Sequence, residues 1–512
     1  MNVYDICAIP ASIEPDRECL VSGRLRLSYA ALDAWTARLA ERLRDHAGRR
    51  IAIIDINSPG LVALLLACWR AGCVAVPFNV RARGEELAYL LHQAEAPVIF
   101  AGERYRDALA AAGASTGAVE AMPRPLAAAP SSDPTPAPAD LSEDTVAIGL
   151  FTSGSTARPK LIEISHANLL AHVVATTELL NNSGSAVVVA APLFHIAALG
   201  SICTGLFSGR RLVLLDEFDP ERWLSAVEAE AATHAFLVPT MLGRLIDHPA
   251  FDAGRLRSLT TLSYGAAPMP PALLERCLER FPDSVGFANG FGQTETTSTV
   301  TLLGPDDHRL VGSPEEIALR RRRLHSVGRA ISGVEVAVLD DDGRSLPPGQ
   351  VGEVAVRGDR VVRGREGGPG AAGRDGWLRT RDLGYLDEDG YLFLAGRADD
   401  MMIRAGENIA PVEVEAVLAS HPDVAEAAVA GIPDDDVGER VGAAVIARPG
   451  HSIDVADLVR HAAARLAAFK RPELVAVVDE LPRSPLGKVQ RPRLRELLQR
   501  EGRPVTTTAG GG

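Results

Sequence analysis

The sequence predicts an α/β protein: a large N-terminal domain of parallel αβ sheets with a β-rich subdomain, then a small mobile C-terminal α+β domain. Short apolar runs alternate with amphipathic ones up to about residue 287, and a second alternation begins near residue 399. Alternating strands and helices are typical of parallel sheets. A chain of 512 residues is also too long for one ordinary core, so at least two packed units are expected.

The N-terminal elements follow from hydrophobic periodicity. Ser28 can cap a helix whose apolar positions, Leu32 to Leu43, recur every three or four residues. Beyond it we expect a strand at RRIAIIDI, a helix ending at Gly72, a strand at CVAVPF, a helix at EELAYLLHQA and a strand at PVIFAG. The stretch from about Ala111 to Asp144 is rich in Ala, Pro, Ser and Thr, which predicts a surface linker.

The second half of the chain changes character. Short strands joined by DG and PG turns indicate a β-rich subdomain at about 325–398, which completes an N-terminal domain of residues 1–398. Residues 399–500 alternate helices and strands and are expected to form the C-terminal domain. The Thr- and Gly-rich end, residues 501–512, is expected to be a flexible tail.

Composition narrows the class of protein. The formal net charge of −13 argues against a general nucleic-acid or anionic-membrane binder, so a phosphate ligand must be held locally. The six cysteines form no CxxC pair, which favours buried thiols in a reducing compartment. No signal peptide or membrane span is visible, and we expect a cytoplasmic protein.

The first chemical motif is the run from Phe151 to Lys160, FTSGSTARPK, which follows the apolar strand VAIGL. Small and hydroxyl-bearing residues allow backbone N–H groups to wrap phosphate oxygens, and Lys160 adds charge. The run is not the GxxxxGK[ST] pattern, and a plain polar turn is the alternative interpretation.

Four further strings occur downstream: NGFGQTET at Asn289, TRDLG at Thr380, GRADD at Gly396 and PLGKVQR at Pro485. In this order and spacing, the five strings resemble the superfamily of acyl-CoA synthetases, nonribosomal adenylation domains and luciferases. The likeness is greatest to acyl- or aryl-CoA ligases and covers nearly the whole chain. It implies an AMP-forming ligase that uses ATP and Mg²⁺ to adenylate a carboxylic acid and then passes the acyl group to a thiol.

The resemblance assigns the nucleotide site. The loop that closes over the β- and γ-phosphates corresponds to Thr152, Ser153, Gly154, Ser155, Thr156 and Lys160, with Ala157 where glycine is usual. Thr294 resembles the hydroxyl on the α-phosphate, and Glu295 the carboxylate on Mg²⁺, a hard cation that prefers oxygen ligands. The adenine would lie along Gly265, Ala266 and Ala267, near Asn289 and Gly290.

Asp382 resembles the ribose ligand, because one carboxylate can accept bonds from two hydroxyls, and Arg397 is expected beside it. Lys488 resembles the catalytic lysine that stabilises charge on the leaving pyrophosphate. Asp399 stands at the family's hinge, about which the C-terminal domain would rotate between two half-reactions. Without the other motifs, Asp382 would be interpreted as a residue that caps a turn, and Lys488 as an exposed lysine that favours solubility.

The acceptor is expected to be CoA. Gly406 would line the channel for the pantetheine thiol, and Lys470 and Arg471 could meet CoA phosphates, since LAAFKRP resembles the segment of CoA ligases. A carrier-protein pantetheine is the second candidate. A third possibility stays open: the enzyme activates an acid or another weak oxyanion, and an amine or a small inorganic nucleophile captures it.

The acid is narrowed by PLFHIAALG. His195 stands where amino-acid-activating domains carry an Asp for the α-amine, which disfavours an α-amino acid. Phe194 and His195 instead resemble the pocket of coumarate, benzoate and medium-chain ligases, so an aryl, arylpropenoic or medium-chain acid is favoured. Tyr264 and Gly290 complete the expected pocket, and simple core packing is the alternative for Phe194 and His195.

Two other classes were weighed. A non-catalytic nucleotide sensor would fit Ala157 in the phosphate loop, but it is disfavoured by the joint presence of Thr294, Glu295, Asp382, Arg397 and Lys488. A luciferase-like oxidation after adenylation has no dedicated oxidase site in the sequence to support it.

Overall fold

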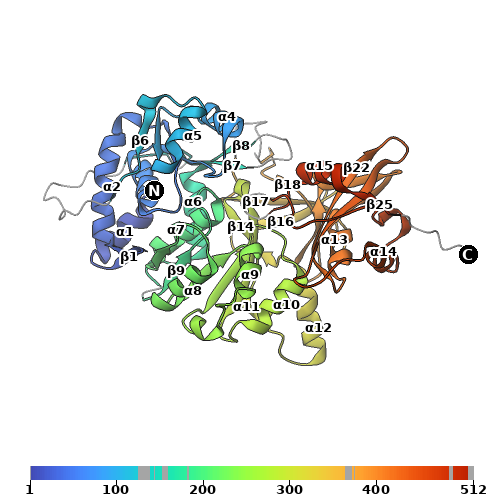
Figure 1. Cartoon of the computed structure of the whole chain (residues 1–512). Helices are drawn as coiled ribbons and strands as arrows, with labels where there is room; N and C mark the ends of the chain where they lie inside the picture. The colour runs from blue at the N-terminus through green and yellow to red at the C-terminus, as the bar shows by residue number, and fades with distance from the viewer. Residues whose placement is uncertain are drawn as a thin grey trace, which may run out of the picture. The chain divides into compact units, whose positions relative to one another are not determined.

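The computed structural model describes residues 2–124, 139–142, 144–152, 159–181, 184–363, 372–373, 375–483 and 488–505 (Figure 1). The chain divides into two compact units, which are treated separately below. The N-terminal unit comprises residues 1–266, 276–336 and 356–378, and the C-terminal unit comprises residues 267–275, 337–355 and 379–512.

A nine-stranded sheet spans the N-terminal unit in the order β15-β14-β13-β12-β11-β9-β10-β1-β2. Strands β9 to β13 and β1 run parallel, and β2, β14 and β15 are antiparallel to their neighbours. The strand bounds are β1 Glu18–Ser22, β2 Leu25–Ser28, β9 Ala186–Val189, β10 Arg211–Leu214, β11 His234–Leu237, β12 Thr261–Gly265, β13 Gly286–Gln293, β14 Ser298–Leu303 and β15 Arg329–Ala330.

A second sheet, in the order β6-β5-β3-β4-β7-β8, is parallel except for the β7–β8 hairpin. Its strands are β3 Arg50–Ile54, β4 Val74–Pro77, β5 Val98–Ala101, β6 Val119–Ala121, β7 Val146–Thr152 and β8 Lys160–Ser165. The longer helices of this unit are α1 Asp5–Ile13, α2 Tyr29–Leu43, α3 Pro59–Ala71, α4 Gly84–Ala94, α6 His166–Thr176, α7 Ile196–Ser208, α8 Pro220–Ala229 and α12 Pro314–Arg323.

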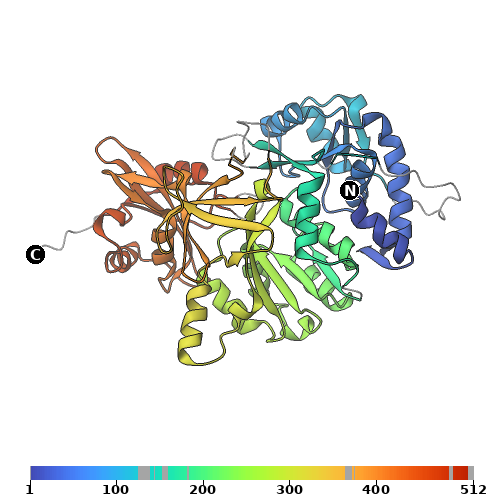
Figure 2. The same cartoon turned by 180° about the vertical axis from the view of Figure 1, so that it is seen from behind.

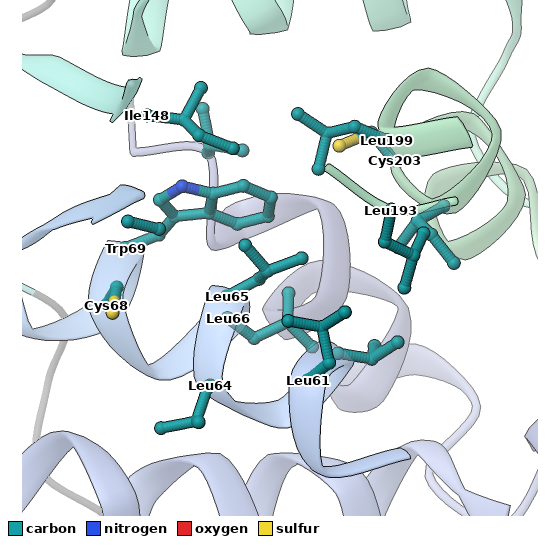
Figure 3. Packing of buried hydrophobic residues seen from close by; sticks show 14 of the residues in the cluster. Leu61, Leu64, Leu65, Leu66, Cys68, Trp69, Ile148, Leu193, Leu199 and Cys203 are labelled. Atoms are coloured by element: carbon teal, nitrogen blue, oxygen red, sulfur yellow. The ribbon is translucent and has the colours of Figure 1, made fainter. Parts of the chain in front are cut away.

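One hydrophobic core joins these two sheets. Helix α3 is apolar all round and buried along almost its whole length, which is typical of a helix enclosed by protein. Figure 3 shows the Trp69 ring on α3 beside Ile148 of β7, with Leu199 and Cys203 of α7 opposite. The Trp69 indole N–H donates to the Ala147 carbonyl at 3.1 Å, so the buried polar atom is satisfied.

Four strands make an antiparallel-rich sheet in the order β16-β17-β18-β19, as the DG and PG turns predict. Their bounds are β16 Val334–Leu339, β17 Gly352–Gly358, β18 Leu378–Leu386 and β19 Leu392–Arg397.

The part of the C-terminal unit from residue 402 on, coloured orange to red in Figures 1 and 2, contains a sheet in the order β21-β20-β23-β24-β25 with β22 also on β23. Alternate residues of β22 and β23 feed two cores, one beneath α13 and α14 and the other beneath α15. The elements are β20 Met402–Arg404, β21 Glu407–Ile409, α13 Pro411–Ala419, β22 Val424–Asp434, β23 Gly438–Ala447, α14 Val455–Ala463, β24 Leu474–Val477, α15 Arg491–Glu501 and β25 Arg503–Pro504.

The predicted elements are confirmed, with further elements that were not predicted and with corrections at the linker and the tail. Ser28 accepts from the Ala31 N–H at the start of α2, and Gly72 ends α3 with φ 74°. Helices α1 and α15 were not expected. The predicted linker is wrong in part, because Val119–Ala121 pairs with β5; three residues are too few for a periodic pattern to reveal a strand.

Two composition-based expectations can also be compared with the fold. All six cysteines are free thiols and buried. Among the described residues, no helix is long and apolar enough to cross a bilayer. The expected flexible tail, residues 501–512, is wrong for its first residues, because Glu501 ends α15 and Arg503–Pro504 form β25 on β24. Residues from 506 on lie outside the described residues, and the domain boundary at Asp399 stays a prediction.

Candidate active site

The candidate residues of the N-terminal unit gather where parallel strands end. Strands β9, β11, β12 and β13 are adjacent and parallel, so their carboxyl ends share one edge of the nine-stranded sheet. Phe194 and His195 follow β9, Gly265 ends β12, and Asn289 to Gln293 end β13. Ligands of open α/β sheets bind outside such an edge, which we call the carboxyl edge.

Gly265 is required by a close approach between β12 and β13. It pairs with Gly290 in register, and a Cβ on Gly265 would lie 2.2 Å from the Gly290 carbonyl oxygen. Glycine is therefore needed at position 265 because the neighbouring strand β13 lies too close for a side chain. Asn289, Gly290 and Ala266 are half-buried at the carboxyl edge. Ala267, which belongs to the C-terminal unit, is also half-buried.

Thr294 and Glu295 lie in a tight 3₁₀ turn after β13, and both are half-buried. The Thr296 hydroxyl donates to the carbonyls of Gln293 and Ser298 at 3.0 and 2.9 Å, which holds the turn closed. Thr297 and Ser298 then take φ values of 48° and 85°, which L-residues rarely adopt.

Such backbone strain recurs at the predicted motifs. Of the eight described non-glycine residues with positive φ, Ala266 and Arg381 lie in predicted segments, and Thr297, Ser298 and Ala405 lie within two residues of one. Strained residues persist where the surroundings over-determine them, and they cluster at functional sites. The strain is a second, independent signal at these segments.

Strands β7 and β8 flank the predicted phosphate loop. Thr152 and Lys160 pair directly across the two strands, and both residues are half-buried. The predictions for Ser153, Gly154, Ser155 and Thr156, and the departure at Ala157, lie outside the described residues.

Phe194 and His195 differ in burial. Phe194 is 6% exposed, whereas His195 is half-buried and precedes the first turn of α7. Their rings lie 4.3 Å apart, centroid to centroid, with an angle of 48°. Core packing therefore accounts for Phe194 better than for His195.

The Tyr264 side chain points away from the predicted pocket. It is 1% exposed, and its hydroxyl is 2.9 Å from His308 Nε2. Burial raises the pKa of Tyr264 well above its usual range. The residue supports the carboxyl edge from inside, and its proposed place in the substrate pocket can be only through its backbone.

In the C-terminal unit, Asp382 and Arg397 face each other across β18 and β19. Arg397 Nη1 lies 3.2 Å from Asp382 Oδ1, and the Asp382 side chain is 11% exposed. This agrees with the expectation that Arg397 stands beside Asp382. Sequence reasoning missed Arg381, whose guanidinium pairs with the Asp399 carboxylate, Nε to Oδ2 at 3.0 Å. Its signal is position: it lies inside TRDLG, directly before Asp382.

Gly406 occupies an exposed hairpin turn. Arg404 of β20 pairs with Glu407 of β21, so Ala405 and Gly406 are the two central residues of the turn. Their φ values of 48° and 84° are those of a type I′ turn, which favours glycine.

The candidate cations of the C-terminal unit have different surroundings. Lys488 is exposed, next to an antiparallel bridge between Arg483 and Val489. Lys470 Nζ lies 2.7 Å from both carboxylate oxygens of Glu413. Arg471 donates to the carbonyls of Ala463 and Leu466 at 3.0 and 3.2 Å, which caps α14. Arg471 therefore has a structural task, and its contact with CoA stays a prediction.

The oxygen donors of Thr294 and Glu295 fit a hard divalent cation. Among the described residues, no three His, Cys, Asp or Glu side chains are grouped so as to hold a metal. A single carboxylate is what Mg²⁺ commonly takes from a protein when phosphates and water supply its other ligands.

The sequence was then compared with protein families and relatives. The AMP-binding enzyme family matches residues 10–364, and the AMP-binding enzyme C-terminal domain matches residues 413–488. Feruloyl-CoA synthase of Amycolatopsis sp is 36% identical over 95% of this chain and 96% of the relative. Indoleacetate–CoA ligase of Aromatoleum aromaticum is 32% identical over 96% and 97%. Fatty acid–[acyl-carrier-protein] ligase ScoC of Streptomyces coeruleorubidus is 32% identical over 95% and 94%.

Solved structures agree. ATP-bound MatB from Rhodopseudomonas palustris superposes with a TM-score of 0.84 at 30% identity, over 97% of this chain and 99% of that one. The amide bond synthetase McbA from Marinactinospora thermotolerans gives 0.83 at 31% identity, over 96% and 99%. The chain belongs to the AMP-binding enzyme family. It is an AMP-forming ligase.

Proposed function

We propose that this protein adenylates an aromatic carboxylic acid with ATP and then transfers the acyl group to the thiol of CoA. The observation that carries the proposal is the carboxyl edge, where Gly265, Asn289, Thr294 and Glu295 meet on adjacent strand ends in the order of the family's nucleotide motifs. The Asp382–Arg397 pair supplies a buried carboxylate for ribose hydroxyls in the C-terminal unit.

In the first half-reaction, a carboxylate oxygen of the acid attacks the α-phosphorus, and the bond to pyrophosphate breaks. The Thr294 hydroxyl would donate to the α-phosphate, and the Glu295 carboxylate would hold Mg²⁺, which screens the phosphate charge. The Lys488 ammonium would stabilise the charge that passes to the leaving pyrophosphate.

In the second half-reaction, the thiol sulfur attacks the acyl carbon, the thiol proton leaves to solvent, and AMP departs with the electron pair of the acyl–phosphate bond. Rotation about Asp399 would exchange Lys488 for the turn Ala405–Gly406. The ion pair between Arg381 and Asp399 would have to open or turn with it.

An aromatic acid is favoured by His195 and by two relatives. His195 is half-buried and follows buried Phe194. The relatives named feruloyl-CoA synthase and indoleacetate–CoA ligase act on aromatic acids.

Two other acceptors have specific support. The relative ScoC is named as an acyl-carrier-protein ligase, which keeps a carrier pantetheine as the second candidate. The neighbour McbA is an amide bond synthetase, which keeps capture by an amine as the third. We place the reaction in the cytoplasm, because six free, buried thiols suit a reducing compartment.

The deciding experiment is ATP–pyrophosphate exchange over a panel of aryl, arylpropenoic, medium-chain and amino acids, followed by product analysis with CoA, a pantetheine-loaded carrier or an amine. We expect exchange with an aromatic acid and a CoA thioester as product. Exchange with amino acids alone would refute the acid class. An amide or carrier product without any CoA thioester would refute the acceptor.

A further inference from the structure

Arg360 is a buried cation outside the motifs that identify the family. It follows β17, is 2% exposed, and has no carboxylate partner among the described residues. Its Nη1 donates to the Thr299 carbonyl at 2.9 Å, and its Nη2 lies 3.5 Å from the Ala171 carbonyl. Burying a guanidinium that has no carboxylate partner costs free energy, so its presence at a buried position needs an explanation.

The groups around Arg360 do not neutralise it. His172 of α6 is 5% exposed, and burial, followed by the charge of Arg360, lowers the pKa of His172 to about 3. His172 is therefore uncharged near neutral pH. Burial also lowers the pKa of Arg360, yet a guanidinium stays protonated in proteins. The charge of Arg360 is stabilised by backbone carbonyls, chiefly that of Thr299.

The segment that carries Arg360 is anchored to α6. Asn168 donates from Nδ2 to the carbonyls of Asp359 and Val361 at 2.8 and 3.3 Å. Asn168 is itself fixed by the capping box with Ser165 at the start of α6. The carbonyls on both sides of Arg360 are thus held by one buried amide, so the guanidinium starts from a rigid base.

The same segment holds Glu295. The Val362 N–H donates to the Glu295 carbonyl at 2.9 Å, while Arg360 holds the carbonyl of Thr299. These two contacts bracket residues 295–299, which include Thr297 and Ser298 with positive φ. A strained turn keeps its shape only if its surroundings fix it at more than one point.

We propose that Arg360 is a positioning residue for adenylation. By holding the Thr299 carbonyl it keeps the strained turn in place and so directs the Glu295 carboxylate toward the Mg²⁺ of bound ATP. A cation serves better than a neutral donor, because charge-assisted hydrogen bonds are about twice as strong. The inference rests on the proposed function for the metal role of Glu295.

The test compares Arg360→Met with Arg357→Met. Methionine keeps length and removes charge and donors. Arg357 lies on β17, three residues before Arg360; its side chain is 43% exposed and pairs with Glu335, so it controls for loss of an arginine. Binding of Mn²⁺ in the presence of ATP is read by electron paramagnetic resonance. Acyl transfer to CoA is measured from supplied acyl-adenylate, a step that needs no metal–phosphate contact.

We expect Arg360→Met to need about tenfold more Mn²⁺ for half-saturation and to adenylate about tenfold more slowly, as for loss of one hydrogen bond to a charged group. Transfer from supplied acyl-adenylate should match the parent, as should both readouts for Arg357→Met. Arg360→Lys should restore part of the Mn²⁺ affinity, because it returns the charge and one donor.

Unchanged Mn²⁺ affinity in folded Arg360→Met would overturn the proposal, and so would an equal loss in both half-reactions, which marks a merely structural residue. If the methionine variant fails to fold, Arg360→Gln decides by the same Mn²⁺ titration. Glu295→Gln, measured in parallel, distinguishes failure of the metal role of Glu295 from failure of the positioning role of Arg360. Unchanged Mn²⁺ affinity in Glu295→Gln would refute both. A parent that releases no pyrophosphate with any acid refutes the proposed function itself.

Discussion

The two units present their candidate residues in contrasting ways. At the carboxyl edge, Gly265, Asn289 and Glu295 are half-buried or buried on paired strand ends and tight turns. In the C-terminal unit, Gly406 lies in an exposed hairpin turn, and Lys488 is exposed. This difference suggests a division of roles. The groups expected to bind the nucleotide in both half-reactions are held in place by the fold, and the groups expected to act in one half-reaction only are exposed.

Lys488→Ala tests this division with the largest expected effect. Adenylation should fall about 10²- to 10³-fold, as for removal of a group that stabilises developing charge, while thioester formation from supplied acyl-adenylate persists. Pyrophosphate release in a single turnover measures the first, and acyl-CoA yield the second. Arg460→Ala, an exposed cation of the same unit, is the control. An equal loss in both steps would end the idea of step-specific groups.

Gly406→Leu should show the opposite selectivity. A Cβ at Gly406 meets no atom within 4 Å in the structure, so leucine adds bulk outward from the turn. We expect acyl transfer to drop by about two orders of magnitude, as for a group that misplaces a reactant, while acyl-adenylate accumulates. Gly406→Ala carries the same strain at φ 84° without the bulk and should transfer at a higher rate. Parental acyl-CoA synthesis by the leucine variant would disprove the channel.

Gly265→Ala tests the fixed region and should harm both half-reactions, because the new Cβ would collide with the Gly290 carbonyl and displace β12 from β13. Overpacking of this kind costs about 1–3 kcal/mol. Urea unfolding and ATP affinity are the measurements. Gly304→Ala, at a nearby glycine whose Cβ would meet nothing within 4 Å, is the matched control. A loss confined to one half-reaction would contradict the division.

The smallest effect concerns acid stability of the N-terminal unit. Because burial lowers the pKa of His172 to about 3 from its ordinary value near 6.5, the unfolded chain binds the proton first. The stabilisation is complete above pH 6.5 and is lost as pH falls toward 3, by about 2 kcal/mol at pH 5. His172→Leu should reduce this pH dependence, with exposed His325→Gln as control.

The four tryptophans, at positions 35, 69, 223 and 377, all lie in the N-terminal unit, so urea unfolding followed by tryptophan fluorescence reports on that unit alone. An unchanged pH dependence in His172→Leu would mean that this histidine is not buried in its neutral form.

Much of the fold was predictable because its elements repeat a local period. The apolar spacing of α2 and the apolar runs of β22 and β23 are visible in the sequence. Strand β6 was missed because three residues carry no period, and α1 because Pro10 lies inside it. Short or irregular elements depend on tertiary contacts, which a single sequence does not display.

The site was predictable to the level of motifs, because phosphate and metal chemistry restricts residue types at short spacings. Packing was less so. Neither the burial of the Tyr264 ring against His308 nor the capping of α14 by Arg471 follows from the motif strings. Arg360 has no local signal at all, since its partners Ala171 and Thr299 are distant in sequence.

The six buried thiols have a practical consequence. Burial raises the pKa of each, to about 12 for Cys73, Cys203 and Cys277 and well above the usual range for Cys7, Cys19 and Cys68, and a thiol without thiolate character reacts slowly with maleimides. A cysteine introduced at an exposed position, such as Glu407, could therefore be labelled with a fluorophore in the otherwise unaltered chain. A dye pair across the two units would report their separation in single molecules as acid, ATP and CoA are added in turn.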